Sequence, residues 1–363
     1  MNPEFWCKRK VLLTGHTGFK GSWLSLWFQS LGAEVIGYSL PPPTQPSLFV
    51  LAGVEKGMES ICGDILDLEH LRRVVREHRP GIVIHMAAQS LVRRSYFDPV
   101  GTYATNVLGT VHVLQAVRDA PAVQAVVVVT SDKCYENREG QRAYRETDRL
   151  GGLDPYSSSK ACAEFVTATF RESFFTGAKR EAIASVGSAR AGNVIGGGDF
   201  AADRLIPDVM RAVLEGTELL IRNPDAVRPW QHVIDPLCGY LMLAEKLCED
   251  PKHFSGSWNF GPEESETLPV AGLLQRISEL WGPGISWRFD GDPHLHEAQH
   301  LKLDSAKAKT QLEWKPQWNL NSALEATVQW YKAQHLHQDV RSLTLQQIRS
   351  YQCALNQPIS LPG

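Results

Sequence analysis

The chain has 363 residues, of which 43% are hydrophobic and 21% charged, proportions typical of a folded globular protein rather than a disordered one. Its net charge of −3 gives no general attraction to nucleic acid or to an anionic membrane surface, so we expect neither as a partner. The scattered cysteines, without a Cys-x-x-Cys pair, and the lack of any ~18-residue apolar run predict a cytoplasmic protein with no disulfide framework, metal site or membrane span.

Short apolar runs alternate with helical patterns in the first half of the chain. Strands are predicted at residues 10–13, 34–38, 82–85, 126–130 and 183–188. Because these runs are apolar on both faces, they fit a parallel sheet that is covered by helices on each side. Helices are predicted between them, at residues 22–31, at 102–117 and from about Tyr156 onward. The pattern predicts an α/β fold with a Rossmann-type, doubly wound parallel sheet.

The regularity fades after about Ala191. Glycines at 196–198 form a loop, prolines separate short segments, and tryptophans gather toward the C-terminus. We expect residues 1–190 to form the main part of the Rossmann domain. Residues 191–363 would form mainly a smaller lobe, partly interleaved with the sheet, that binds substrate and returns some segments to the first domain.

A glycine-rich turn directly follows the first predicted strand and opens a helix. Its glycines have G-x-x-G-x-x-G spacing rather than the more usual G-x-G-x-x-G. Glycine lets the backbone approach a pyrophosphate, and the N-terminus of the helix offers free N–H groups to bind it. We therefore predict a dinucleotide site at this turn, formed by Gly15, Thr17, Gly18, Phe19, Lys20 and Gly21.

Later strand ends would complete the cofactor site. The second strand leads to Ser39, with neither the acidic residue that usually holds the adenosine ribose nor an arginine for a 2′-phosphate, so we favour NAD over NADP. Asp64 and Ile65 suit a contact with the adenine edge, although an aspartate in that place is often a helix cap. Strand-end residues expected beside the cofactor are Ala87, Ala88, Gln89 and Thr130, with Gln89 lying between the cofactor and the substrate.

Tyr156 and Lys160 stand four residues apart on a helix that Pro155 is suited to begin, so both side chains would share one face. The lysine would lower the pKa of the phenol, which could then take a proton from a sugar hydroxyl. On its own, this spacing also occurs by chance in surface pairs. The strand at 126–130, however, ends in Ser131-Asp132-Lys133, and α/β sheets bind their ligands at the carboxyl ends of such strands.

Taken together, the glycine turn, Tyr156 with Lys160, and Asn106 in a Thr-Asn-Val-Leu-Gly-Thr segment resemble the extended short-chain dehydrogenase/reductase superfamily over nearly the whole chain. The longer motifs at 14–23, 38–49, 130–137 and 228–232 resemble, more narrowly, the CDP-glucose 4,6-dehydratases. The resemblance implies that NAD, contacted also by Asn106, Tyr156 and Lys160, is regenerated in each turnover. The substrate would be CDP-glucose, and the product, CDP-4-dehydro-6-deoxy-D-glucose, would serve deoxysugar and surface polysaccharide (O-antigen) synthesis.

The resemblance also assigns roles at the end of the 126–130 strand. Ser131 matches a threonine of the related dTDP-glucose dehydratases, Asp132 their acid, and Lys133 the glutamate that removes the C5 proton. Lys133 departs from that pattern, because a lysine is a base only when neutral. It is therefore a base with a lowered pKa, a cation that stabilises the enolate, or a solvated turn residue.

The diphosphate of a nucleotide sugar needs donors, and charge-assisted bonds from arginine would supply them. Our candidates are Asn193, Arg204 and Arg228, with Gln89 and Ser131 beside the sugar. The helices at 102–117 and 157–175 match those that pair into a four-helix interface in the superfamily. We therefore expect a homodimer or homotetramer.

Three alternatives stay open at the level of sequence. The first is a dehydratase of a dTDP- or GDP-linked sugar. The second is a UDP-hexose 4-epimerase, which needs no acid and base at C6 and C5, so that Asp132 and Lys133 count against it. The third, a non-catalytic dinucleotide sensor, is disfavoured by the intact Ser131, Tyr156 and Lys160.

Overall fold

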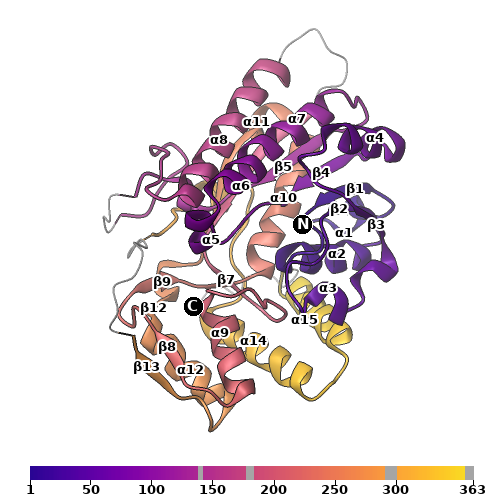
Figure 1. Ribbon diagram of the computed structural model, residues 1–363. Helices are drawn as coiled ribbons and strands as arrows, with labels where there is room; N and C mark the ends of the chain where they lie inside the picture. Colours follow the sequence, from indigo (N-terminus) through magenta and orange to yellow (C-terminus); the bar gives the residue numbers. More distant parts are fainter. Residues whose placement is uncertain (138–141, 177–183, 291–300, 356–363) are drawn as a thin grey trace, which may run out of the picture.

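The computed structural model describes residues 1–137, 142–176, 184–290 and 301–355. Its centre is a seven-stranded sheet in the order β11-β6-β5-β4-β1-β2-β3, with every neighbouring pair parallel (Figure 1). The predicted fold class is confirmed. The strands are β1 (Lys10–Thr14), β2 (Glu34–Ser39), β3 (Glu59–Cys62), β4 (Ile82–His85), β5 (Ala125–Val129), β6 (Ser185–Ala191) and β11 (Gly256–Phe260).

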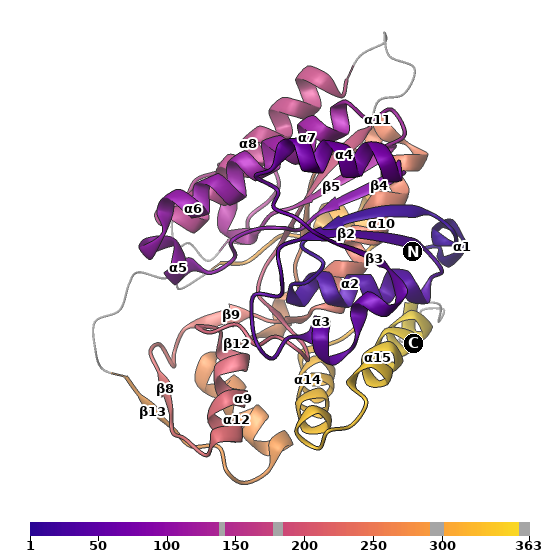
Figure 2. The ribbon, with the colours of Figure 1, turned by 45° about the vertical axis from the view of Figure 1, so that its right-hand side comes forward.

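Helices cover both faces of this sheet because alternate residues of each central strand point to opposite sides. Val126 and Val128 of β5 belong to the core beneath α4 and α7, whereas Val127 belongs to the larger core beneath α2 and α10. Figure 2 shows the two helical layers from the side. The covering helices are α2 (Phe19–Ser30), α4 (Leu68–His78), α7 (Gly109–Arg118), α8 (Pro155–Phe174) and α10 (Ile234–Glu249). Outside this layer, α15 (Val340–Leu355) packs on α2, and α14 (Leu320–His335) packs on α15.

A smaller lobe of short strands and helices lies beyond the carboxyl ends of the central strands (Figures 1 and 2). Its described strands form pairs: β7 (Val194–Ile195) with β10 (Gln231–His232), β9 (Val227–Pro229) with β12 (Thr267–Pro269), and β8 (Leu219–Ile221) with β13 (Trp287–Phe289). Two helices of this lobe are α9 (Leu205–Glu215) and α12 (Val270–Trp281).

Short elements join the longer ones. Those in the first half are α1 (Pro3–Trp6), α3 (Leu48–Leu51), η1 (Val54–Gly57), α5 (Val92–Phe97), α6 (Pro99–Tyr103), η2 (Ala104–Leu108) and η3 (Asp132–Cys134). Later in the chain they are α11 (Pro251–Phe254), η4 (Glu264–Glu266) and α13 (Ala306–Gln311). Within the described residues, no helix combines the length and apolar character needed to cross a membrane.

The predicted strands at 10–13, 34–38, 82–85 and 126–130 are confirmed as β1, β2, β4 and β5. The strand predicted at 183–188 corresponds to β6, although residue 183 lies outside the described residues. The helix predicted at 102–117 is interrupted. One turn of π-helix, η2, separates α6 from α7 and contains the buried Asn106. Such wide turns are rare and often stand at functional sites.

Candidate active site

The glycine turn forms a cradle too tight for side chains. Gly15 has a φ of 78°, and a Cβ there would lie 2.7 Å from the backbone nitrogen of Ala87 at the end of β4. A Cβ on Gly21 would lie 2.1 Å from the carbonyl oxygen of Gly15. Gly18 precedes α2 without a side-chain cap, which leaves the first amides of the helix available to an anion. The cradle therefore fits the pyrophosphate of a dinucleotide.

The hydroxyls predicted to hold the adenosine ribose lie together. The Thr17 and Ser39 oxygens are 2.9 Å apart, and Thr17 also donates to the carbonyl of Leu40. The Asp64 carboxylate accepts from the backbone amide of Leu66 at 2.9 Å, so it caps a local turn. Serine in place of an acid at this strand end leaves a weaker hold on the ribose.

Asn106 joins the end of β4 to the helix that carries Tyr156. Its side chain accepts a 2.8 Å hydrogen bond from the Gln89 amide and donates to the Gln89 carbonyl at 2.9 Å and the Ser159 hydroxyl at 2.8 Å. The Gln89 side chain is itself engaged by Leu91 and Thr102. Asn106 thus fixes the Gln89 backbone relative to α8, and hydrogen bonds to Leu91 and Thr102 orient the Gln89 side chain.

Helix α8 begins at Pro155 as predicted, with Asp154 as its N-cap. Tyr156 and Lys160 are both buried on the side of α8 that faces the sheet. The Lys160 ammonium reaches the carbonyl of Val129, the last residue of β5, at 3.4 Å. The helix therefore places both groups at the carboxyl end of a central strand.

The polar residues after β5 meet this helix. Ser131 donates to the Asp132 carboxylate at 2.9 Å and accepts from the Lys133 amide at 3.2 Å, and so caps the short helix η3. Ser131 is also a hydrogen-bonding neighbour of the Tyr156 hydroxyl, and Asp132 acts on Tyr156 electrostatically. The structure thus brings the strand end and Tyr156 into one cluster.

Burial sets the charges of this cluster. It raises the pKa of Tyr156 to about 12, against the lowering influence of Ser131, and lowers the pKa of Lys160 to about 8. The sequence predicted that Lys160 would lower the pKa of the phenol. The net shift is upward because desolvation of the buried phenol outweighs the influence of its neighbours, and the lowering by Lys160 stays a prediction. The tyrosine therefore needs a nearby proton acceptor to become a base.

A buried ion pair fixes this helix to the sheet. Glu164, one helical turn beyond Lys160, lies 2.6 Å from Arg190 of β6 and accepts a 2.8 Å hydrogen bond from Ser188. The hydroxyl of Thr130 also donates to Glu164. Because both charged side chains are almost fully buried, each depends on the other for its solvation.

Lys20 is a further functional candidate, and the role of its side chain was not inferred from the sequence. It was predicted only as part of the glycine turn, yet its ammonium interacts electrostatically with Asp132, Lys160 and Arg204. Burial first, and then Arg204, lower its pKa to about 8. Its nitrogen lies 6.0 Å from the ring of Tyr240, a buried residue whose hydroxyl has no partner among the described residues. The position of Lys20 in the first turn of α2, next to the carboxyl end of β1, is the sequence feature that could have indicated this role.

The candidate phosphate-binding residues come from the C-terminal half. Arg204 lies 2.8 Å from Asp199 and 3.0 Å from the Ser90 hydroxyl, and it acts on Tyr156 electrostatically. Asn193 stands in the turn between β6 and β7. Arg228 lies on β9, which pairs with β12. The interactions of Arg204 join it to the Tyr156 cluster.

Another buried acid, Asp235, connects the first turn of α10 to the C-terminal helix. Its carboxylate accepts hydrogen bonds of 2.8 Å from the Tyr351 hydroxyl and from the Gln317 amide, while its second oxygen has no partner among the described residues. Burial raises the pKa of Asp235 to about 7. The folded protein therefore holds this proton more tightly than the unfolded chain does.

We expect this group to weaken the protein as the pH rises from about 4 to 7. The stabilisation from protonated Asp235 is complete at pH values below the pKa of Asp235 in the unfolded chain. It is lost as the pH rises through the pKa of Asp235 in the folded protein, which lowers the free energy of unfolding by about 4 kcal/mol at most. Urea unfolding of the wild type and of Asp235→Asn at pH 5 and pH 8 measures it. The stability of the wild type relative to the variant should fall between these pH values, and a constant difference would contradict the prediction.

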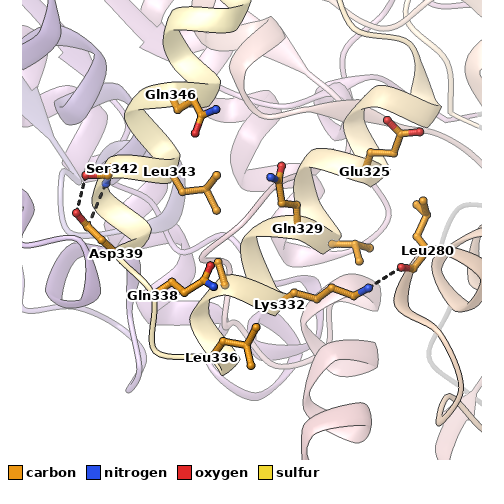
Figure 3. A pocket seen from close by; sticks show the side chains of 12 residues that line it. Leu280, Glu325, Gln329, Lys332, Leu336, Gln338, Asp339, Ser342, Leu343 and Gln346 are labelled. Carbon is orange, nitrogen blue, oxygen red and sulfur yellow. Dashed lines mark hydrogen bonds between the residues drawn. The ribbon is translucent and has the colours of Figure 1, made fainter.

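A groove of about 650 Å³ lies between α14 and α15 (Figure 3). None of the predicted site residues lines it. Lys332 is directed toward the carbonyl of Leu280 at 2.9 Å, and Ser342 bonds to Asp339 at the start of α15. With these polar groups already paired, the groove offers no cluster comparable to that around Tyr156.

Comparisons with known proteins agree with this geometry. A model of the NAD dependent epimerase/dehydratase family matches residues 11–259. A CDP-glucose 4,6-dehydratase of Salmonella typhimurium is 49% identical over 355 residues, covering 98% of this chain and 99% of that protein. A dTDP-glucose 4,6-dehydratase of Xanthomonas campestris is 27% identical over 344 residues, covering 88% and 92%. The solved dTDP-glucose 4,6-dehydratase of Bacillus anthracis in complex with NAD shares the fold, with a TM-score of 0.74, 23% identity and coverage of 92% and 99%.

Proposed function

The chain belongs to the NAD dependent epimerase/dehydratase family, and we propose that it converts CDP-D-glucose to CDP-4-dehydro-6-deoxy-D-glucose and water. The observation that carries this proposal is the meeting of Tyr156 with Ser131 and Asp132 at the end of β5. This cluster would supply a base for the C4 hydroxyl of the sugar and an acid for its C6 hydroxyl. The 49% identity to a CDP-glucose 4,6-dehydratase supports cytosine as the base of the nucleotide in the substrate.

NAD is the cofactor of the family, and when bound it would accept the hydride of C4 and return it to C6. The amides at the start of α2 would hold its pyrophosphate, while Thr17 and Ser39 would face its ribose. Asn106 would keep the Gln89 backbone in place beside the nicotinamide. These residues bind and orient, and they exchange no protons with the sugar.

Tyr156 is the proposed base for the C4 hydroxyl. Its proton acceptance is aided by the charges of Lys160, on the same face of α8, and of Arg204, which acts on the phenol electrostatically. Ser131 is a hydrogen-bonding neighbour of the same phenolic oxygen. Removing the proton of the C4 hydroxyl as the hydride leaves C4 gives the ketone that acidifies C5.

Elimination of water would then use Asp132 and Lys133. Asp132, 4% exposed, is the proposed acid for the C6 hydroxyl. Lys133 acts at C5, either as a neutral amine that removes the proton or as a cation that stabilises the enolate. Its ammonium has no hydrogen-bond or ion-pair partner within the described part of the chain, which leaves it available for either role. An epimerase would need neither group.

The diphosphate of the substrate would lie against Arg204, with Asn193 and Arg228 as further donors. Arg204 is already held by Asp199 and Ser90, so it presents its charge in a fixed place. The expected homo-oligomer and its cytoplasmic location belong to the same proposal. The seven cysteines are free thiols, which supports a reducing compartment. The product would serve deoxysugar synthesis for surface polysaccharide.

Product analysis with different nucleotide sugars tests the proposed function. Purified protein with NAD should convert CDP-glucose to a 4-keto-6-deoxy product and act far more slowly on dTDP-, GDP- and UDP-glucose. Faster turnover of another nucleotide sugar would move the assignment to that base. Formation of CDP-galactose would assign the protein to the epimerases.

We propose that the exposed apolar side chains around α6 and α8 form a dimer interface. Phe97, Val100, Leu108 and Phe165 are 83%, 79%, 46% and 56% exposed, and their elements pack side by side (Figure 2). Such a patch is unusual on a monomer. Light scattering should show a dimer or larger assembly for the wild type and a monomer for Phe165→Glu. Phe289→Glu, on β13, is the control and should keep the wild-type mass, and a monomeric wild type would contradict the proposal.

A further inference from the structure

The proposed reaction leaves the protons of the site unbalanced, and the following inference rests on that proposed function. Oxidation of C4 deposits the hydroxyl proton on Tyr156, since the C4 oxygen ends as a ketone. Loss of the C6 hydroxyl as water takes a proton from Asp132. The proton removed from C5 is replaced there when C6 is reduced. A proton must therefore pass from Tyr156 to Asp132 before the next turnover can begin.

The structure places one hydroxyl between these two groups. Ser131 donates to the Asp132 carboxylate at 2.9 Å and is a hydrogen-bonding neighbour of the Tyr156 hydroxyl. The backbone amide of Lys133 donates to the Ser131 oxygen at 3.2 Å and fixes its position at the start of η3. Because the Ser131 proton points to Asp132, the Ser131 oxygen can accept a hydrogen bond from the phenol in addition to the one from the Lys133 amide.

Burial favours this internal route. Tyr156 and Ser131 are each 7% exposed and Asp132 is 4% exposed, so exchange of protons with bulk solvent is restricted. The pKa of Tyr156, raised to about 12 by burial, means that the phenol keeps its proton at neutral pH unless an acceptor is adjacent. The positive charge of Arg204 favours the phenolate once the proton has left.

We propose that Ser131 relays a proton from the Tyr156 hydroxyl to the Asp132 carboxylate. The O–H bond of Tyr156 breaks as a new O–H bond forms on Ser131, while the original Ser131 O–H bond breaks and an O–H bond forms on Asp132. The negative charge moves from the carboxylate to the phenolate, and nothing is oxidised or reduced. A single transfer thus produces both the base for C4 and the acid for C6.

The relay is tested in the first half of the reaction, where Asp132 has no role as an acid. CDP-6-deoxyglucose lacks the C6 hydroxyl, so it can undergo C4 oxidation but not elimination. With this analogue, we expect Asp132→Asn to slow reduction of the cofactor by about 10²-fold, because the phenol loses its proton acceptor. Electrostatics alone predicts the opposite, since Asp132 raises the pKa of Tyr156 and its neutralisation would favour the phenolate. An unchanged or faster rate would overturn the relay.

Variants of the hydroxyl complete the experiment. Ser131→Ala should slow C4 oxidation about as much as Asp132→Asn, and the double variant should lose no more, because both changes cut one path. Ser131→Thr keeps a hydroxyl and should recover most of the rate lost in Ser131→Ala. Losses that multiply in the double variant would contradict the relay.

Controls separate this inference from the proposed function. Asp119→Asn neutralises an acid on the surface, ion-paired to Arg72 at 3.1 Å, and should oxidise the analogue at the wild-type rate. NAD binding and circular dichroism verify that each variant is folded. If the wild type oxidises neither CDP-glucose nor the analogue, the proposed function fails and the relay with it. If the wild type oxidises both and Asp132→Asn is unimpaired, the relay alone fails.

Discussion

Tyr156→Phe should lower turnover of CDP-glucose by about 10⁴-fold while leaving the fold and NAD binding intact. The change removes one oxygen from a buried ring and keeps the packing of α8 on the sheet. Without the phenol, the proposed base that accepts the proton of the C4 hydroxyl is missing when the hydride leaves. The loss should therefore be seen in the first half-reaction as well, so that the absorbance of reduced nicotinamide does not rise after mixing.

Steady-state and stopped-flow assays of Tyr156→Phe measure this effect. Tyr103→Phe, which removes the same oxygen from a partly exposed ring on α6, is the matched control and should keep the wild-type rate. Turnover of Tyr156→Phe within a few-fold of the wild type would remove this residue from the chemistry. A normal oxidation rate with slow product formation would place its role after C4 oxidation.

Lys133→Met should separate oxidation from elimination. The variant keeps a side chain of similar length but can neither remove the C5 proton nor stabilise the enolate. The Tyr156, Ser131 and Asp132 cluster stays complete, so C4 oxidation should continue. Elimination should fall by about 10²–10⁴-fold, and reduced cofactor should accumulate with the 4-keto sugar. Exchange of the C5 hydrogen with deuterated solvent should fall in parallel.

The two roles of Lys133 differ in their response to a carboxylate. Lys133→Glu offers a base without a positive charge, so a variant that keeps the wild-type rate would identify proton removal as the function of this position. An inactive variant would favour stabilisation of the enolate by the cation. Lys252→Met, on the surface helix α11, should be fully active. A fully active Lys133→Met would exclude both roles and leave Lys133 as a solvated turn residue.

The sheet could be predicted where its strands are apolar on both faces. β4 and β5, each buried along its whole length, were found within a single residue of their bounds. β3 was missed because this edge strand is mostly exposed and shows no apolar run. β11 was missed because its pairing with β6 joins residues far apart in sequence, and a short run with Ser257 and Asn259 gives no local signal. The division at residue 190 stays a prediction.

The site could be predicted where chemistry follows from position in a parallel sheet. The rule that ligands bind at carboxyl strand ends led to Ser131 and Asp132, and the helical spacing led to Tyr156. Interactions that depend on the direction of a long side chain could not be predicted from the sequence. The electrostatic interactions of Lys20 with Arg204 and Asp132 depend on how α2 packs at this edge of the sheet. The protonation of Tyr156 follows from its burial, which residue spacing does not show. The histidines at 294, 296 and 300 lie outside the described residues.

The fate of a single hydrogen tests the central claim most directly. CDP-glucose carrying deuterium at C4 is converted in ordinary water, and the product is examined by NMR and mass spectrometry. If the protein oxidises C4, eliminates water and reduces C6 in one active site, the deuterium should appear at C6 and a solvent proton at C5. Deuterium that remains on C4 of the product, or none at C6, would contradict the account.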